Sequence, residues 1–138
     1  MATIDDQRHQ MIRTVIMRRP DAIGNVTLHL WECLAVELTS IIGDGGFQSL
    51  YARSTHLARA QFPWIIINPP ATSTASLFVN LKKCLEERDS KTACEASITL
   101  LNIFIDILIL LIGELLTTSI LRSAWGDDAV NIAGTELQ

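Results

Sequence analysis

Hydrophobic residues recur every three or four positions along most of this chain, which is the period of an α-helix, and no segment shows the strict alternation of a strand. Proline and glycine divide this pattern into separate segments, with Pro20 and Gly43 at two of the breaks. The pattern predicts five helices, within residues 4–19, 21–43, 44–62, 73–88 and 91–125.

Short turns join most of these segments, so neighbouring helices are expected to pack antiparallel. The sequence therefore predicts an all-α fold, a single-domain up-and-down bundle of about five helices. We place the bundle in residues 1–126 and expect a flexible acidic tail at 127–138, where no hydrophobic period remains.

The fifth segment contains the most apolar stretch of the chain, LLNIFIDILILLIGELL at residues 100–116. A membrane span needs about 20 mostly apolar residues, and Asp106 divides this one. On a helical projection, the polar and small residues fall along one narrow seam. The seam contains Glu95, Thr99, Asn102, Asp106, Gly113 and Thr117. We expect a long, apolar, C-terminal helix at the centre of the bundle, with membrane association as the alternative.

The two acids of this stretch, Asp106 and Glu114, do not form a catalytic pair by themselves. Eight residues on one helix separate them by about 12 Å along the axis and about 80° around it. Shared proton or metal chemistry would need partners from other helices, and we predict no catalytic residue in the chain.

The connector FPWIIINPPATS, residues 62–73, is unusually apolar for a loop. Its expected role is to cover an open end of the core, and the alternative is a ligand or partner surface. That surface would contain Trp64, Ile65, Ile66, Ile67 and, from the fifth segment, Phe104.

Composition narrows the range of partners. Apolar residues make up 49% of the 138, and the mean hydropathy is +0.29, so we expect apolar surface beyond one core and, from it, a homodimer or a protein partner. The net charge of −4 argues against nucleic-acid binding, which needs a basic surface. Three cysteines without close spacing, and the lack of a secretory signal pattern, indicate a cytoplasmic protein.

Four potential metal ligands lie near one another in the second segment: His29, Glu32, Cys33 and Glu37. Their spacing places them on neighbouring turns of a helix. A helix-borne metal site usually repeats such a motif on another helix, and this sequence has no second copy. We therefore expect no metal and no cofactor.

His56 is the remaining candidate for chemistry. It lies on the outward side of the third segment, an arrangement that resembles histidine phosphotransfer modules. Those modules carry a lysine three residues after the histidine, where this chain has Arg59. The resemblance implies phosphoryl transfer at His56 with Arg59 as the cation, and a basic surface patch is the alternative.

No nucleophile elbow, phosphate-binding loop, zinc-protease motif or dinucleotide fingerprint is present in the sequence. We therefore expect a non-enzymatic regulatory or interaction module that self-associates. A bundle that binds a small apolar ligand or lipid, and a phosphotransfer module in signalling, are the alternatives.

Overall fold

The computed structural model of the chain describes residues 10, 12–14, 16, 23–65 and 74–125. Its helices are α2 (Ile23–Ala58), α3 (Thr74–Glu86), α4 (Ser90–Ile112) and α5 (Glu114–Trp125). Residues 10, 12–14 and 16 are also helical, and no strand occurs within the described part of the chain. The predicted all-α bundle is confirmed.

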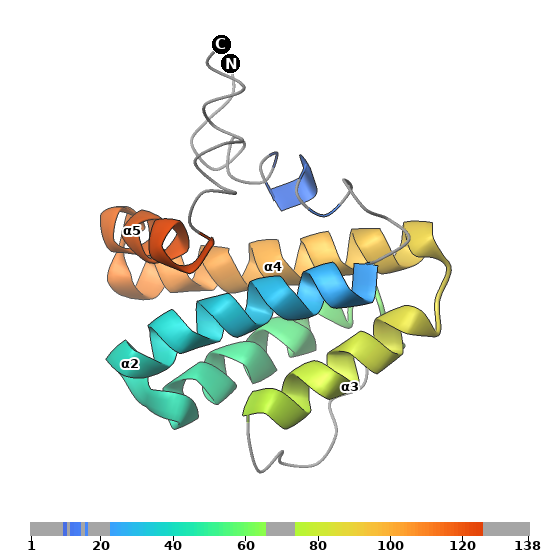
Figure 1. The fold of residues 1–138 in the computed structure, drawn as a ribbon, viewed down its shortest axis with the longest axis horizontal. Helices are drawn as coiled ribbons and strands as arrows, with labels where there is room; N and C mark the ends of the chain where they lie inside the picture. Colours follow the sequence, from blue (N-terminus) through green and yellow to red (C-terminus); the bar gives the residue numbers. More distant parts are fainter. Residues whose placement is uncertain (1–9, 11, 15, 17–22, 66–73, 126–138) are drawn as a thin grey trace.

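Helix α2 is two helices joined by a kink at Gly43 (Figure 1). The backbone there has φ 79° and ψ 167°, a combination that is accessible essentially to glycine alone. The chain reverses at this point, so the two halves of α2 lie side by side. The predicted break between residues 21–43 and 44–62 is therefore confirmed.

Aromatic side chains from α2, α3 and α4 form the centre of the core around Trp31. Its ring centroid lies 4.9 Å from that of Phe104, 5.2 Å from that of Tyr51 and 5.9 Å from that of Phe78. Phe47 completes the cluster, and each of the five rings meets at least one other ring edge to face. Because the members come from three helices, this cluster fixes how both halves of α2 pack against α3 and α4.

The predicted single helix over residues 91–125 is wrong in one respect. It is divided at Gly113, which has φ 90° and ψ 163°, and α5 turns away from α4 there. α4 therefore has no continuous extension to residue 125, and the most apolar helices are the first half of α2 and α4. The bend is possible because glycine lacks the side chain that excludes this conformation.

Polar contacts fix the ends and faces of α4. Asp89 caps its N-terminus by accepting a hydrogen bond from the Thr92 amide at 3.1 Å, and hydrogen bonds from Thr92 lower the pKa of the Asp89 carboxyl. Further along, the buried Ser97 hydroxyl lies 2.6 Å from that of Thr27 on α2. This pair allows two polar groups to lie between closely packed helices.

The helical residues before α2 pack against the bundle. Ile12 and Ile16 are buried, and Arg13 forms a 2.8 Å ion pair with Glu95 of α4. Four members of the predicted polar seam, Glu95, Thr99, Asn102 and Asp106, are half-buried along the border of α4. The seam does not continue as predicted, because Gly113 lies at the bend and Thr117 is buried on α5. The predicted tail, residues 127–138, and most of the connector lie outside the described residues.

Candidate functional site

Four leucines around the α4–α5 bend are exposed to solvent. The exposed fraction is 85% for Leu110, 64% for Leu111, 89% for Leu115 and 45% for Leu116. We call this set the leucine corner. Isolated exposed leucines are common on protein surfaces, but clusters of them are not. Two exposed leucines on each side of one bend therefore form a candidate contact surface.

The bend at Gly113 is what brings these leucines outward. Leu110 and Leu111 are in the last turn of α4, and Leu115 and Leu116 are in the first turn of α5. Residues further along α5 turn inward instead. Thr117, Ile120, Leu121 and Trp125 are buried, so α5 has one face on the core and begins with its apolar side chains in solvent.

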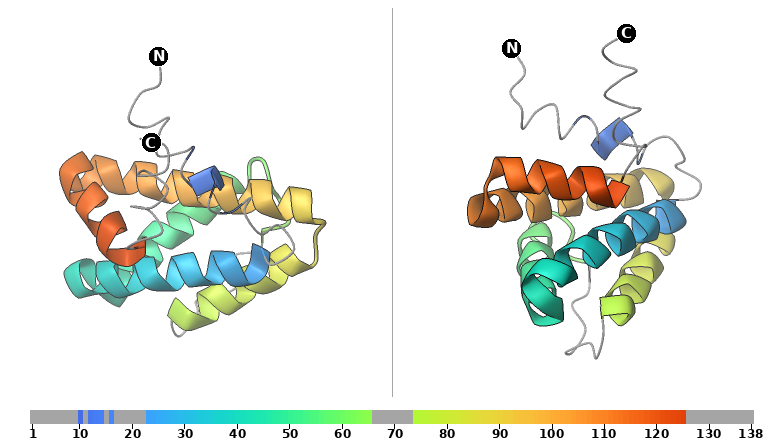
Figure 2. Two further views of the ribbon diagram at one scale, coloured as in Figure 1. Left: turned by 45° about the horizontal axis from the view of Figure 1, so that its top comes forward. Right: turned by 60° about the vertical axis from the view of Figure 1, so that its left-hand side comes forward.

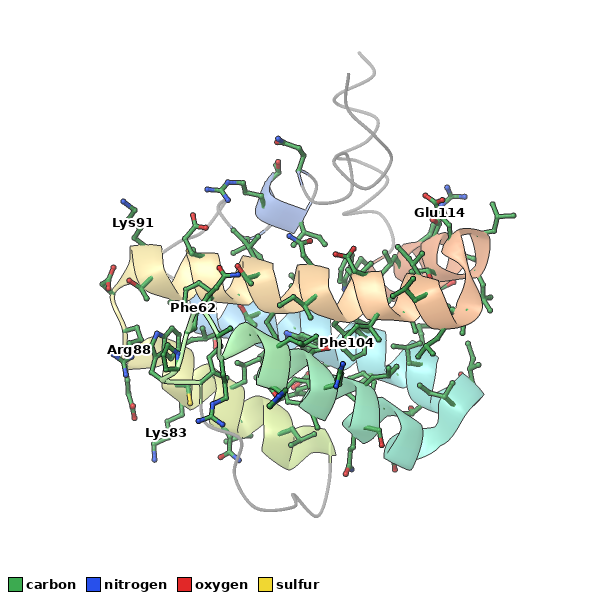
Figure 3. The ribbon with its side chains drawn as sticks, turned by 180° about the vertical axis from the view of Figure 1, so that it is seen from behind. Phe62, Lys83, Arg88, Lys91, Phe104 and Glu114 are labelled. Carbon is green, nitrogen blue, oxygen red and sulfur yellow. The ribbon has the colours of Figure 1, made fainter. Side chains whose placement is uncertain are left out.

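The leucine corner lies at the same end of the bundle as the kink of α2 (Figures 1 and 2). Ile41, two residues before that kink, is 53% exposed and adds an apolar side chain to this end. Figure 3 shows Lys83, Arg88 and Lys91 at one end of the molecule and Glu114 at the other. The leucine corner therefore lies at the end that carries Glu114, opposite Lys83, Arg88 and Lys91.

The residues expected to form a ligand or partner surface are spread over different environments. Phe104 is completely buried in the aromatic cluster, and Ile65 is 2% exposed. Trp64 is half-buried, and the Arg88 guanidinium carbon lies 4.9 Å from its ring centroid. Ile66 and Ile67 lie outside the described residues. Among the described residues of the expected surface, Trp64 therefore has a partly accessible ring with a charged neighbour, Arg88.

His56 and Arg59 are both exposed near the C-terminal end of α2. His56 is in the last turn of the helix, and the Arg59 amide donates to the Thr55 carbonyl at 3.0 Å just beyond it. This placement keeps the imidazole accessible to solvent, as phosphoryl transfer would need, and it is equally that of an ordinary surface residue.

The potential metal ligands of α2 lie on its outer side. The Cys33 sulfur is 3.8 Å from Nε2 of His29, one helical turn away. Glu32 is exposed and Glu37 is half-buried. Among the residues that the structure describes, no three histidine, cysteine or acidic side chains gather closely enough to hold a metal ion.

Asp106 and Glu114 lie on different helices because the bend at Gly113 separates them. Asp106 is half-buried on the border of α4, and Glu114 is exposed at the first position of α5. The acids therefore occupy separate environments, and neither lies in a group of metal-ligating side chains within the described residues.

Two described helices, α2 and α4, are long and apolar enough to cross a membrane by length and composition alone. Both contribute to the buried core, and the core helices of soluble proteins pass the same test. The bend after α4 and the kink within α2 lie at one end of the bundle (Figure 1). The helix that follows the bend, α5, packs against both α2 and α4.

The sequence pattern did not predict the leucine corner, because it predicted a single helix over residues 91–125. In a continuous helix the apolar residues surround the axis, and all of them are assigned to a core. The available signal was Gly113 itself, the sole glycine in a long helical pattern, which marks a potential helix end.

Comparison of the chain with protein-family models, with curated proteins and with solved structures finds no match. The function proposed below therefore rests on the chemistry of the described surface.

Proposed function

We propose that this protein is a helical self-association module, a non-enzymatic bundle that dimerises through its leucine corner. The observation that carries the proposal is the exposure of Leu110 and Leu115, at 85% and 89%. An exposed leucine side chain is in an unfavourable environment, and burying it against a partner contributes about 1.5–3 kcal/mol of binding free energy.

The size of the leucine corner fits a weak or moderate dimer. A dissociation constant of 1 μM corresponds to about −8 kcal/mol. Partial burial of four leucines on each of two copies supplies a binding free energy of this size. It does so even after subtraction of the free energy that is lost when the two copies are brought together. Ile41 at the same end would widen the contact.

The charge distribution favours a protein partner over a membrane at this surface. Anionic lipid attracts basic residues, at about 1 kcal/mol for each lysine or arginine near the surface. Glu114 precedes Leu115 in the first turn of α5, whereas Lys83 and Lys91 lie at the opposite end of the bundle (Figure 3). The charged side chain among the leucines of residues 110–116 is therefore a carboxylate, which anionic lipid does not attract.

Sedimentation velocity over a range of protein concentration tests the proposal, with Leu110→Gln and Leu116→Gln as the variants. Glutamine keeps the helical propensity of leucine closely enough that the fold is retained. Val79→Gln is the matched control because Val79 is 60% exposed but lies on α3. We expect wild type and the control to form dimers and each leucine variant to weaken dimerisation at least tenfold.

Two results would contradict the proposal. One is a wild-type chain that sediments as a monomer of 15.3 kDa at every concentration. The other is a dimer that both leucine variants form as tightly as wild type. Flotation with neutral and anionic vesicles adds a third reading, since vesicle binding that Leu116→Gln abolishes would assign the corner to lipid.

A further inference from the structure

The joint between α4 and α5 is a single residue. The Gly113 amide donates to the Ile109 carbonyl at 2.8 Å, and the Gly113 carbonyl accepts from the Thr117 amide at 3.1 Å. Both bonds are of the type that a continuous helix makes between residues four apart. Straightening Gly113 would keep them and add bonds from the amides of residues 114–116 to the carbonyls of 110–112.

The bent conformation depends on glycine. With φ 90° and ψ 163°, Gly113 occupies a region that costs other residues about 1–3 kcal/mol. A Cβ built on Gly113 would meet nothing within 4 Å, so glycine is needed there for its backbone conformation and not to make room for a neighbour. The joint is therefore free to straighten wherever α5 finds equivalent contacts.

α5 makes such contacts with α2. The Trp125 indole Nε1 donates to the Leu30 carbonyl at 3.0 Å, and Ile120 and Leu121 are buried in the same core. These contacts have the same chemistry whether the α5 helix belongs to the same chain or to a second copy. Exchange of identical elements at a short joint is a common, low-cost route to dimers.

The sequence around the joint is nearly symmetric, reading LLIGELL over residues 110–116. In a straightened helix, Leu110 and Leu116 lie three residues before and after Gly113, about 60° to either side of it around the axis. If two such helices cross antiparallel at Gly113, each Leu110 lies against Leu116 of the second copy. Glycine at the crossing allows the two axes to approach closely, and Glu114 lies about 40° from Leu110, at the edge of that face.

We propose that the second copy is bound by exchange of α5. Gly113 straightens in both chains, residues 90–125 become one helix, and each α5 packs on the α2 of the other copy. The two straightened helices cross at Gly113, where Leu110 and Leu116 become buried. This inference rests on the proposed self-association and specifies how the two copies are joined.

Cross-linking between two isotopic forms of the full chain tests the exchange. Equal amounts of ordinary and heavy-nitrogen-labelled protein, each with a benzophenone photo-crosslinker at Ala124, are mixed by unfolding and refolding together. Ala124 packs at the edge of the core beside Trp125, which contacts α2. Cross-links formed from position 124 therefore show which copy of α2 lies beside α5. A second pair of samples places the group at the exposed Ser123, in case the first disturbs packing.

In the dimer fraction, we expect cross-links from α5 to α2 that join a light to a heavy chain. Gly113→Ala should increase the dimer at least tenfold at a given concentration, because alanine opposes the bend and favours the continuous helix. Gly45→Ala is the control, since Gly45 is helical without a positive φ and a Cβ there meets open space. It should leave the dimer fraction unchanged.

The outcomes separate this inference from the proposed function. Dimers whose α5–α2 cross-links join only chains of the same isotope would overturn the exchange and leave self-association standing. The exchange is also overturned if Gly113→Ala fails to increase the dimer fraction. A chain that remains monomeric in every sample would overturn both.

Discussion

The indole Nε1 of Trp125 donates a hydrogen bond to the backbone carbonyl of Leu30 at a distance of 3.0 Å. Both groups are buried, and 95 residues separate them along the chain. The contact joins the last described turn of α5 to the middle of the first half of α2. It fixes the position of α5 and, with it, the angle at which the leucine corner projects.

We predict that Trp125→Phe lowers the free energy of unfolding by about 1.5–3 kcal/mol. The loss combines one hydrogen bond with the smaller volume of the phenyl ring. Leu30 lies within α2, so its carbonyl keeps its helical donor and is not left unsatisfied. Urea unfolding measures the change, and the exposed Ser123→Ala serves as the control, within about 0.5 kcal/mol of wild type. Equal stability of the two variants would show that the indole contact does not stabilise the fold.

The buried hydroxyls of Thr27 and Ser97 lie 2.6 Å apart between α2 and α4. Thr27→Val should cost about 1–3 kcal/mol, because valine has the same shape but leaves the Ser97 hydroxyl without this partner. The double variant Thr27→Val with Ser97→Ala should be destabilised by less than the sum of the single changes. A double-mutant cycle from urea unfolding measures the coupling, and strictly additive effects would show that the two hydroxyls do not interact.

Two neighbouring glycines of α2 should respond in opposite directions to alanine. Gly43 has φ 79° and ψ 167°, so Gly43→Ala is expected to destabilise the protein by about 1–3 kcal/mol. Gly45 lies in regular helix with open space around it, so Gly45→Ala should stabilise by about 0.5–1 kcal/mol. Thermal unfolding of the pair is the measurement, and a stabilising Gly43→Ala would be inconsistent with the kink.

Burial raises the pKa of Tyr51, and a charge on the Cys84 thiol would raise it further. A raised pKa in the folded state means that the neutral phenol is favoured there. The associated stability is present below the ordinary value of 10.0 and is lost as the pH rises through the folded-state pKa. Tyr51 is the chain's single tyrosine, so its ionisation can be followed without interference.

An ultraviolet titration should therefore show no tyrosinate in the folded protein at pH values where a free phenol is fully ionised. Its appearance should coincide with the loss of helical circular dichroism. Tyrosinate that appears near pH 10 while the helices remain intact would place Tyr51 outside the core.

Helical period and glycine position were sufficient to predict most of the fold. The apolar stripe that contains Trp31 is buried, and Gly43 lies at a reversal between two helices, as expected. At both places, local signals agree with the packing that the whole chain adopts. The apolar stripe of a helix and a glycine at a helix end can both be predicted from nearby residues alone.

The leucine corner could not be predicted in the same way. Gly113 is followed by good helix formers, Glu114, Leu115 and Leu116, so the local pattern favours continuation of the helix. Whether such a glycine is bent depends on the contacts that α5 makes with α2, above all those of Trp125, which are distant in sequence. Exposure of Leu110 follows only from that bend.

Methyl NMR of leucine- and valine-labelled protein tests whether the copies meet at the leucine corner. Spectra are recorded over roughly a hundredfold range of protein concentration around the expected dissociation constant. Dimerisation through the leucine corner should change the methyl signals of Leu110, Leu111, Leu115 and Leu116 with concentration and leave those of the exposed Val79 unchanged. Spectra that are independent of concentration, or changes that centre on Val79 and leave the leucine corner unaffected, would contradict it.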